Sequence, residues 1–285
     1  MSRFVTLILR ELWEHQNLWR VPLILLVLVI LANIGFSGAA TWLGLAPPEV
    51  SSQVVGSTLG SLGSVVFLVF SFLVLFYLVD CLYAERKDKS ILFWRSLPIS
   101  DTQAVLAKLF VAAVAIPIIL WITIIASHLI TLVIQSVGGD SDGRLFSLID
   151  LGAYWRNLLF ILLLTSMWTL PLQTWLLFCS SWSKRTPFVA ALTIPVVIML
   201  LDQIFSTGIG LGGLIADRIP FGHRFGGGEN GLLFGLLGIT SSYASEISLS
   251  QFVAFFRQPG LWAGLAAAAG FTALTVWTRR WRDDS

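Results

Sequence analysis

Residues 57–82 read STLGSLGSVVFLVFSFLVLFYLVDCL, a run in which the only charged side chain, Asp80, stands near the end. An α-helix needs about 20 consecutive apolar residues to cross the hydrocarbon core of a bilayer. Backbone groups inside that core have no water to bind, so only helices and closed barrels cross it. The run is too long and too continuously apolar for a barrel strand, and it therefore predicts a transmembrane helix.

The rest of the chain extends this prediction. The 285 residues are 56% hydrophobic and only 12% charged, about half the charge of a soluble domain. We expect an all-α integral membrane protein that forms one transmembrane domain, residues 1–285, in the lipid bilayer. The net charge of +2 gives no reason to expect nucleic acid as a partner. Apolar length and flanking charge predict six spans, near residues 21–45, 57–82, 109–135, 158–180, 187–205 and 260–278.

The positions of lysine and arginine predict the orientation. With a cytoplasmic N-terminus, thirteen of the 18 basic residues fall in inside segments and only five outside. Short loops rich in these residues remain in the cytoplasm, so six spans place both termini there. A cleaved signal peptide ending near residues 36–40 is disfavoured, because the apolar run is too long and acidic residues precede it. Cys81 and Cys179 then lie at cytoplasmic span ends, which predicts free thiols.

Two regions outside the spans have a pattern of their own. Residues 3–20 alternate apolar and charged side chains at helical spacing, which predicts an amphipathic helix along the membrane surface (interfacial segment 1–20). The predicted extracytoplasmic loop, residues 206–259, is rich in glycine and contains a short apolar stretch, residues 232–239. That stretch is too short to span, so we expect either a re-entrant segment or an external helix.

The sequence lacks the motifs of the common catalytic sites. It contains no Gly-x-x-x-x-Gly-Lys-Ser/Thr phosphate loop, no His-Glu-x-x-His and no Gly-x-Ser-x-Gly, so we expect no catalysis, metal or cofactor on this chain itself. Ionisable residues inside spans often mark a transport pathway, which makes His128 and Asp202 candidates. For His128, packing is the favoured interpretation over proton relay. Prolines at 117, 171 and 195 are expected to bend their helices.

The segment after the second span, residues 85–100, reads ERKDKSILFWRSLPIS. Glu85 and Lys89 are four residues apart, which predicts a helical ion pair. Ser90 is a plausible helix cap and Pro98 a helix end. The apolar residues between them are too few to cross a membrane. The residues alone leave two interpretations equally open, an anchor on the membrane surface and a helix that docks on another protein.

At this point the sequence resembles a family. Glu85-Arg86, Ser90-Ile91-Leu92, Arg95-Ser96-Leu97-Pro98-Ile99-Ser100 and Val105-Leu106-Ala107-Lys108 are similar, in this order, to the cytoplasmic stretch of type-2 ATP-binding-cassette (ABC) transporter permeases. The resemblance implies six spans, cytoplasmic termini, an amphipathic N-terminal helix and outer helices between the last two spans.

The resemblance also implies a function. The chain would be the permease subunit of an ABC exporter in the bacterial cytoplasmic (inner) membrane. It would pair with a second permease copy, as a homodimer or with a sister subunit, and with two ABC ATP-binding subunits that hold ATP and Mg. Residues 85–100 would be the coupling helix, with the ATPase-coupling residues Glu85, Arg86, Ile91, Leu92, Phe93, Trp94, Arg95, Leu97 and Pro98.

Two other functions stay open from the sequence. An ion-coupled secondary transporter would use His128 and Asp202 and would need no ATPase. A non-transporting membrane scaffold or assembly factor would form complexes without a transport cycle.

Overall fold

The computed structural model describes residues 3–42, 52–91, 99–138, 150–205 and 249–281, together with residues 213, 215 and 218. Within these residues the chain is helical and contains no strand, which confirms the all-α prediction. The elements in chain order are α1 (Arg3–Glu14), α2 (Asn17–Trp42), α3 (Ser52–Lys87), α5 (Asp101–Phe110), the π-helix η1 (Val111–Ala115), α6 (Ile116–Gly138), α7 (Leu151–Trp182), α8 (Pro187–Phe205), α11 (Leu249–Arg257) and α12 (Pro259–Trp281).

Five helical segments within the described residues are long and apolar enough to cross a membrane. They are α2, α3, the continuous helix formed by α5, η1 and α6, then α7 and α12. Helix α8 is apolar over Pro187–Asp202 but shorter than the other five, so the sixth span stays a prediction. The predicted amphipathic segment 3–20 is divided in two, because α1 ends at Glu14 and α2 begins at Asn17. The apolar stretch 232–239 lies outside the described residues.

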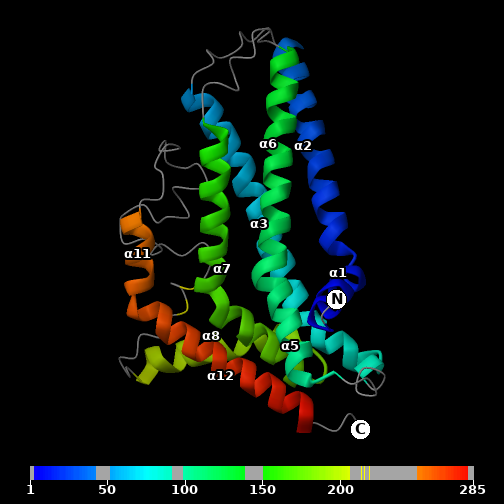
Figure 1. Cartoon of the computed structure of the whole chain (residues 1–285), viewed down its shortest axis with the longest axis vertical. Helices are drawn as coiled ribbons and strands as arrows, with labels where there is room; N and C mark the ends of the chain where they lie inside the picture. Colours follow the sequence, from blue (N-terminus) through cyan, green and yellow to red (C-terminus); the bar gives the residue numbers. More distant parts are fainter. Residues whose placement is uncertain are drawn as a thin grey trace.

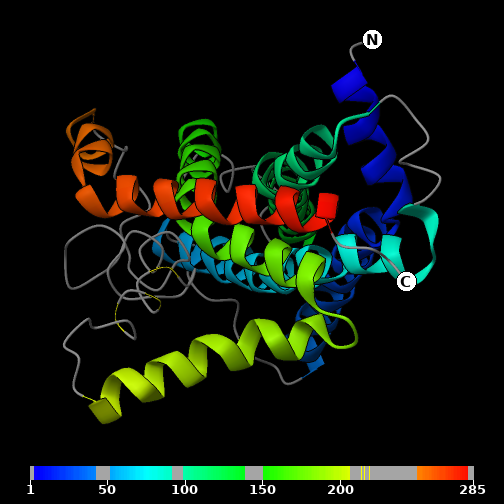
Figure 2. The ribbon, with the colours of Figure 1, turned by 90° about the horizontal axis from the view of Figure 1, so that it is seen from below.

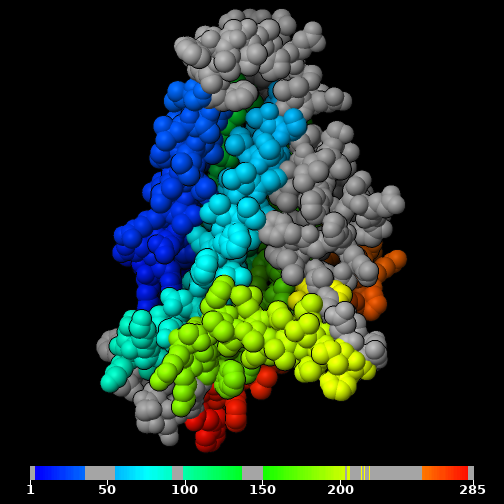
Figure 3. Space-filling model, turned by 180° about the vertical axis from the view of Figure 1, so that it is seen from behind, coloured from blue at the N-terminus to red at the C-terminus, as the bar shows by residue number. Residues whose placement is uncertain are grey.

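The helices lie in two directions. Helices α2, α3, α6 and the first part of α7 run along the long axis, whereas α8 and α12 cross the lower end (Figure 1). From below, α12 and the last part of α7 lie side by side and α8 lies on the outside (Figure 2). The back face shows α8 across the lower part of the molecule, below α2 and α3 (Figure 3). The first and last described helices, α1 and α12, both lie toward this lower end (Figure 1).

The connection between α3 and α5 has a defined stop and start. Lys89 takes a left-handed backbone conformation, with φ of 56°, which ends a helix. Helix α5 begins at a capping box, in which the Ser100 side chain accepts from the backbone N–H of Gln103 at 3.2 Å. Because α3 ends at Lys87, Glu85 and Lys89 do not share a helix. Among the described residues Glu85 pairs elsewhere, so the predicted Glu85–Lys89 pair is wrong.

Side chains of α7 donate hydrogen bonds to two backbone carbonyls, each of which stands four residues before a proline. Pro117 has no N–H to donate to the carbonyl four residues earlier, that of Ala113. The Ser166 hydroxyl of α7 donates to this carbonyl at 2.7 Å, and the π-helix η1 lies at the same place. Pro195 leaves the Ala191 carbonyl open in the same way, and the Trp175 indole of α7 donates to it at 3.1 Å. Side chains of α7 thus donate to two carbonyls that stand four residues before a proline.

Helix α7 itself changes direction. Its lower part turns to run beside α12 (Figure 1), and this part of the helix contains Pro171. A proline inside a helix removes one backbone bond and commonly causes such a bend. The bend lets one helix contact both groups of elements, those along the long axis and those across the lower end.

Candidate functional site

The most concentrated group of charges is buried where four helices meet. We call it the ionic cluster. It contains three carboxylates and three cations, so its formal charges balance. Its members are Arg10 and Glu11 of α1, Glu85 of α3, Asp101 and Lys108 of α5, and Arg279 of α12.

Lys108 is at the centre of the ionic cluster. Its ammonium donates to both carboxylate oxygens of Glu11 at 2.8 Å and lies 3.0 Å from Glu85 Oε1. All three residues are almost fully buried, with exposed fractions of 1% for Lys108, 2% for Glu11 and 3% for Glu85. A buried charge is tolerated only when it is paired and hydrogen-bonded. Here each of the three charges meets that condition.

Arg279 joins the two sides of the α3–α5 connection. Its Nη1 donates to Glu85 Oε2 at 2.8 Å and its Nε donates to Asp101 Oδ1 at 2.9 Å. Glu85 precedes the connection and Asp101 follows it, so one guanidinium of α12 ties both of its ends. Arg10 of α1 adds a further bond to Glu85 Oε1 at 2.8 Å.

Arg86 fixes the end of α3 to a different helix. Its guanidinium donates to the carbonyl oxygens of Ser180, and of Ser183 at 2.9 Å, at the C-terminal end of α7. Basic side chains commonly satisfy the last carbonyls of a helix in this way. Neighbouring Tyr83 donates to the Arg185 carbonyl at 2.9 Å.

The predicted ATPase-coupling residues therefore divide into two groups. Glu85 and Arg86 bind other helices of this chain, and Ile91 is buried. The other predicted members lie outside the described residues: Leu92, Phe93, Trp94, Arg95, Leu97 and Pro98. Among residues 85–89, only residues 87–89 are exposed. The exposed charged surface beside the connection thus begins at Lys87.

His15 lies at the edge of the ionic cluster, between α1 and α2. Its ring packs edge-on against Tyr77 with centroids 4.8 Å apart, and its Nε2 lies 3.7 Å from Glu11 Oε2. Burial lowers the pKa of His15 below its ordinary value, although the Glu11 carboxylate opposes this effect.

The structure does not bring His128 and Asp202 into one site. The two ring nitrogens of His128 lie 2.9 Å from the Leu59 carbonyl oxygen and 3.2 Å from the Trp155 indole nitrogen. A neutral imidazole donates to the carbonyl and accepts from the indole. Asp202 is on α8, which crosses the lower end, whereas α6 runs up the molecule (Figure 1). Packing accounts for His128, and a pathway role for either residue stays a prediction.

Cysteine and metal chemistry give no further site in the described residues. Cys81 and Cys179 are both buried and unpaired, as expected. No group of three His, Cys, Asp or Glu residues with metal-binding geometry occurs in the part of the chain that the structure describes.

Sequence reasoning missed three residues that the structure makes important. Lys108 was recognised only as part of a motif, and Arg279 only as a basic residue near the chain end. Their partners are far away in sequence, so no local pattern reveals them. Gln173 of α7 was not singled out, yet its spacing from Ser166 and Thr169, seven and four residues, places all three on one helix face. That polar stripe in an apolar span was a detectable signal.

These observations define a class and then a family. A chain with several membrane-length apolar helices is a multi-pass membrane protein. The sequence model of the ABC-2 family transporter protein matches residues 53–220, more than half of the chain. The chain therefore belongs to the ABC-2 family, whose permeases are the non-catalytic membrane component of a transporter, and the resemblance seen in residues 85–108 is confirmed. Neither the curated proteins nor the solved structures include a significant match.

Proposed function

We propose that this chain is the permease subunit of an ABC exporter that works with a separate ATP-binding subunit. Two permease copies, identical or sister subunits, form the translocation unit, and two ATP-binding subunits carry ATP and Mg. The complex lies in the bacterial cytoplasmic membrane with both permease termini in the cytoplasm. Residues 85–100 form the coupling segment, in which residues 87–98 contact the ATP-binding subunit.

The observation that carries this proposal, beside the family match, is the attachment of the α3–α5 connection. Arg279 binds Glu85 before the connection and Asp101 after it. Lys108 and Arg10 bind Glu85 to α5 and α1. A displacement of the connection is therefore transmitted to four helices together rather than lost in a flexible loop.

This arrangement suggests a route for coupling. Nucleotide binding shifts a conformational equilibrium only through contacts that differ between the two states. Contacts between the ATP-binding subunit and residues 87–98 supply that difference. The ionic cluster holds the ends of α3, α5 and α12 as one body, so a movement of the connection changes how these helices pack on α7. In this view Glu85 and Arg86 transmit the movement from within the permease.

The experiment tests the residues proposed to contact the ATP-binding subunit. The full chain is co-expressed with the ATP-binding subunit encoded beside it, and the complex is purified and assayed for ATP hydrolysis. We expect Lys87→Glu combined with Lys89→Glu to reduce co-purification of the ATP-binding subunit at least about tenfold, since rim charges determine association. Trp94→Ala is expected to have a similar effect. The matched control is Lys184→Glu, because Lys184 is also exposed.

Four results would contradict the proposal. One is assembly and ATP hydrolysis unchanged in both variants, and a second is an equal loss in the Lys184→Glu control. A third is transport that proceeds without any ATP-binding subunit and is lost in His128→Ala, which would favour an ion-coupled transporter. Stable complexes without substrate-stimulated ATP hydrolysis would instead favour a scaffold.

A further inference from the structure

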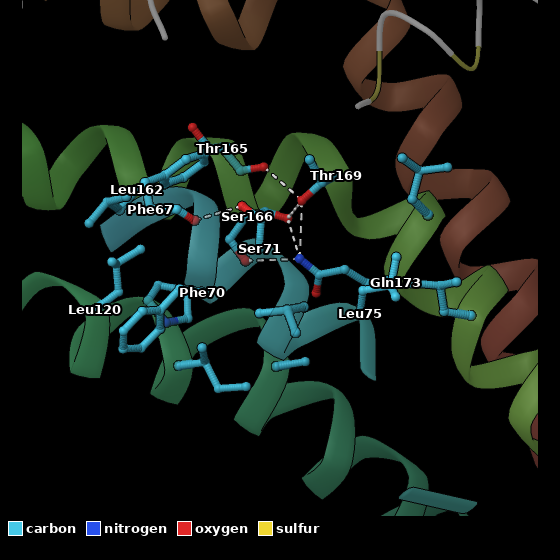
Figure 4. A pocket seen from close by; sticks show the side chains of 16 residues that line it. Phe67, Phe70, Ser71, Leu75, Leu120, Leu162, Thr165, Ser166, Thr169 and Gln173 are labelled. Carbon is cyan, nitrogen blue, oxygen red and sulfur yellow. Dashed lines mark hydrogen bonds between the residues drawn. The ribbon is translucent and has the colours of Figure 1, made fainter. Parts of the chain in front are cut away.

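A cavity of about 140 Å³ lies between α3, α6 and α7. Sixteen residues line it, and none of them is charged. Phe67, Phe70, Leu120 and Leu162 belong to its apolar wall, whereas α7 contributes a polar stripe that ends at Gln173 (Figure 4). Since an uncompensated charge is costly in such surroundings, the lining favours an uncharged occupant.

The hydrogen bonds of the polar stripe fix the orientation of the Gln173 amide. The Ser166 hydroxyl uses its only hydrogen on the Ala113 carbonyl, and the Thr169 hydroxyl uses its own on backbone carbonyls of α7. Both hydroxyls are therefore left as acceptors. Gln173 Nε2 donates to them at 3.3 Å and 3.1 Å. The amide nitrogen must face the hydroxyls, and the oxygen must face away.

That orientation leaves one acceptor without a donor. Gln173 is 7% exposed, and its Oε1 has no hydrogen-bond partner among the described residues. In Figure 4 this oxygen is turned away from Thr169. Most buried polar atoms in proteins have a partner. Nε2 also donates to the Ser166 carbonyl oxygen at 3.4 Å, so all three of its bonds are 3.1 Å or longer. Since the terminal torsion of glutamine is broad, a small rotation presents Oε1 to an occupant.

Size distinguishes an organic group from water. A water molecule takes about 30 Å³ of liquid volume and needs two to four polar partners, whereas an apolar cavity of about 150 Å³ accepts benzene. The cavity has the volume of a benzene-sized group. Two buried polar atoms of its described lining residues, Gln173 Oε1 and Thr165 Oγ1, have no hydrogen-bond partner. A single water would satisfy Gln173 but would leave the apolar wall unfilled.

We propose that this cavity binds an uncharged, benzene-sized apolar group that carries one hydrogen-bond donor, which Gln173 Oε1 accepts. A phenolic ring and a short hydroxylated or amide-bearing acyl segment have this chemistry. That the bound molecule is transported rests on the proposed function above. The binding itself does not, and it is measured on the permease alone.

The test uses three fluorinated probes of nearly equal ring size. Fluorine NMR follows 4-fluorophenol, fluorobenzene and 4-fluoroanisole added to nanodiscs that contain the full chain, with empty nanodiscs as the reference. We expect saturable binding, with 4-fluorophenol about five- to tenfold tighter than fluorobenzene because one hydrogen bond is gained. The ether cannot donate, so 4-fluoroanisole should bind no better than fluorobenzene.

Two variants locate the site. Gln173→Leu should remove the preference for 4-fluorophenol while fluorobenzene still binds, and Ala112→Leu should weaken both probes by filling the cavity. Gln135→Leu, the same exchange at an exposed position of α6, should change nothing.

The proposal is overturned if no probe binds above empty nanodiscs, which would indicate a cavity filled by water. It is also overturned if 4-fluoroanisole binds the unchanged chain as tightly as 4-fluorophenol does. A third contradicting result is a Gln173→Leu variant that still prefers 4-fluorophenol over fluorobenzene. Loss of ATPase coupling in the earlier experiment would leave these binding results unaffected, so the two proposals fail separately.

Discussion

Buried polar groups are satisfied differently in the ionic cluster and in the wall of the cavity between α3, α6 and α7. In the ionic cluster, opposite charges from α1, α3, α5 and α12 are brought together and every carboxylate has a cation within 3.0 Å. None of the residues that line the cavity is charged, and two of their buried polar atoms, Gln173 Oε1 and Thr165 Oγ1, have no hydrogen-bond partner. The cluster is complete without a ligand, whereas the cavity is not.

This difference separates the two roles in the proposed cycle. Breaking a buried ion pair leaves an uncompensated charge, so the ionic cluster resists rearrangement and holds the helices that it connects as one rigid body. A wall of neutral groups costs less to rearrange, because each hydrogen bond contributes only about 1 kcal/mol net. We therefore expect the ionic cluster to transmit movement and the cavity wall to change shape. Three stability measurements test this contrast.

The largest effect is expected for Lys108→Met. The exchange removes the cation that both Glu11 and Glu85 contact, and loss of one partner from a buried pair costs about 3–5 kcal/mol. We expect a large drop in the thermal unfolding temperature of the detergent-purified chain, or failure to accumulate. Lys184→Met, at an exposed lysine, is the matched control and should be nearly neutral. Equal stability of Lys108→Met and the control would show that the ionic cluster does not hold these helices together.

A smaller effect is expected at the cavity wall. Ser166→Ala removes the donor to the Ala113 carbonyl, which costs about 1–3 kcal/mol because the carbonyl is left without a partner. In the Pro117→Ala background the backbone itself supplies a donor, so the same exchange should cost less. Thermal unfolding of the four chains in this cycle measures the coupling. Additive effects would show that Ser166 does not compensate for the proline.

The smallest effect concerns pH. Burial lowers the pKa of His15 in the folded chain, so the unfolded chain binds more protons as pH falls below the ordinary value of about 6.5. Stability should therefore be retained above that value and lost gradually below it. Thermal unfolding over this range should show a smaller pH slope in His15→Gln than in the unchanged chain. A slope of the same size in both would assign the pH dependence to other groups.

Sequence reasoning located the helices better than the site. Apolar length and flanking charge were sufficient to predict the five membrane-length helices, because the thickness of the bilayer core determines how many apolar residues a span needs. They did not reveal that Glu85 faces inward, since its partners Lys108 and Arg279 come from other helices. The predicted pair with Lys89 failed because the backbone turns before that residue. Tertiary contact decides which charges are buried, and a single sequence does not contain that information in local form.

The bond between Ser166 and Ala113 has a consequence for how related chains should vary. A relative with a residue other than proline at position 117 regains a backbone N–H that can donate to the carbonyl at position 113. A hydroxyl at position 166 is then not needed as a donor to that carbonyl. A relative that keeps the proline should keep a small donor at 166. Substitutions at these two positions, on different helices and far apart in the chain, should therefore accompany one another through divergence. The same reasoning applies to Pro195 and Trp175.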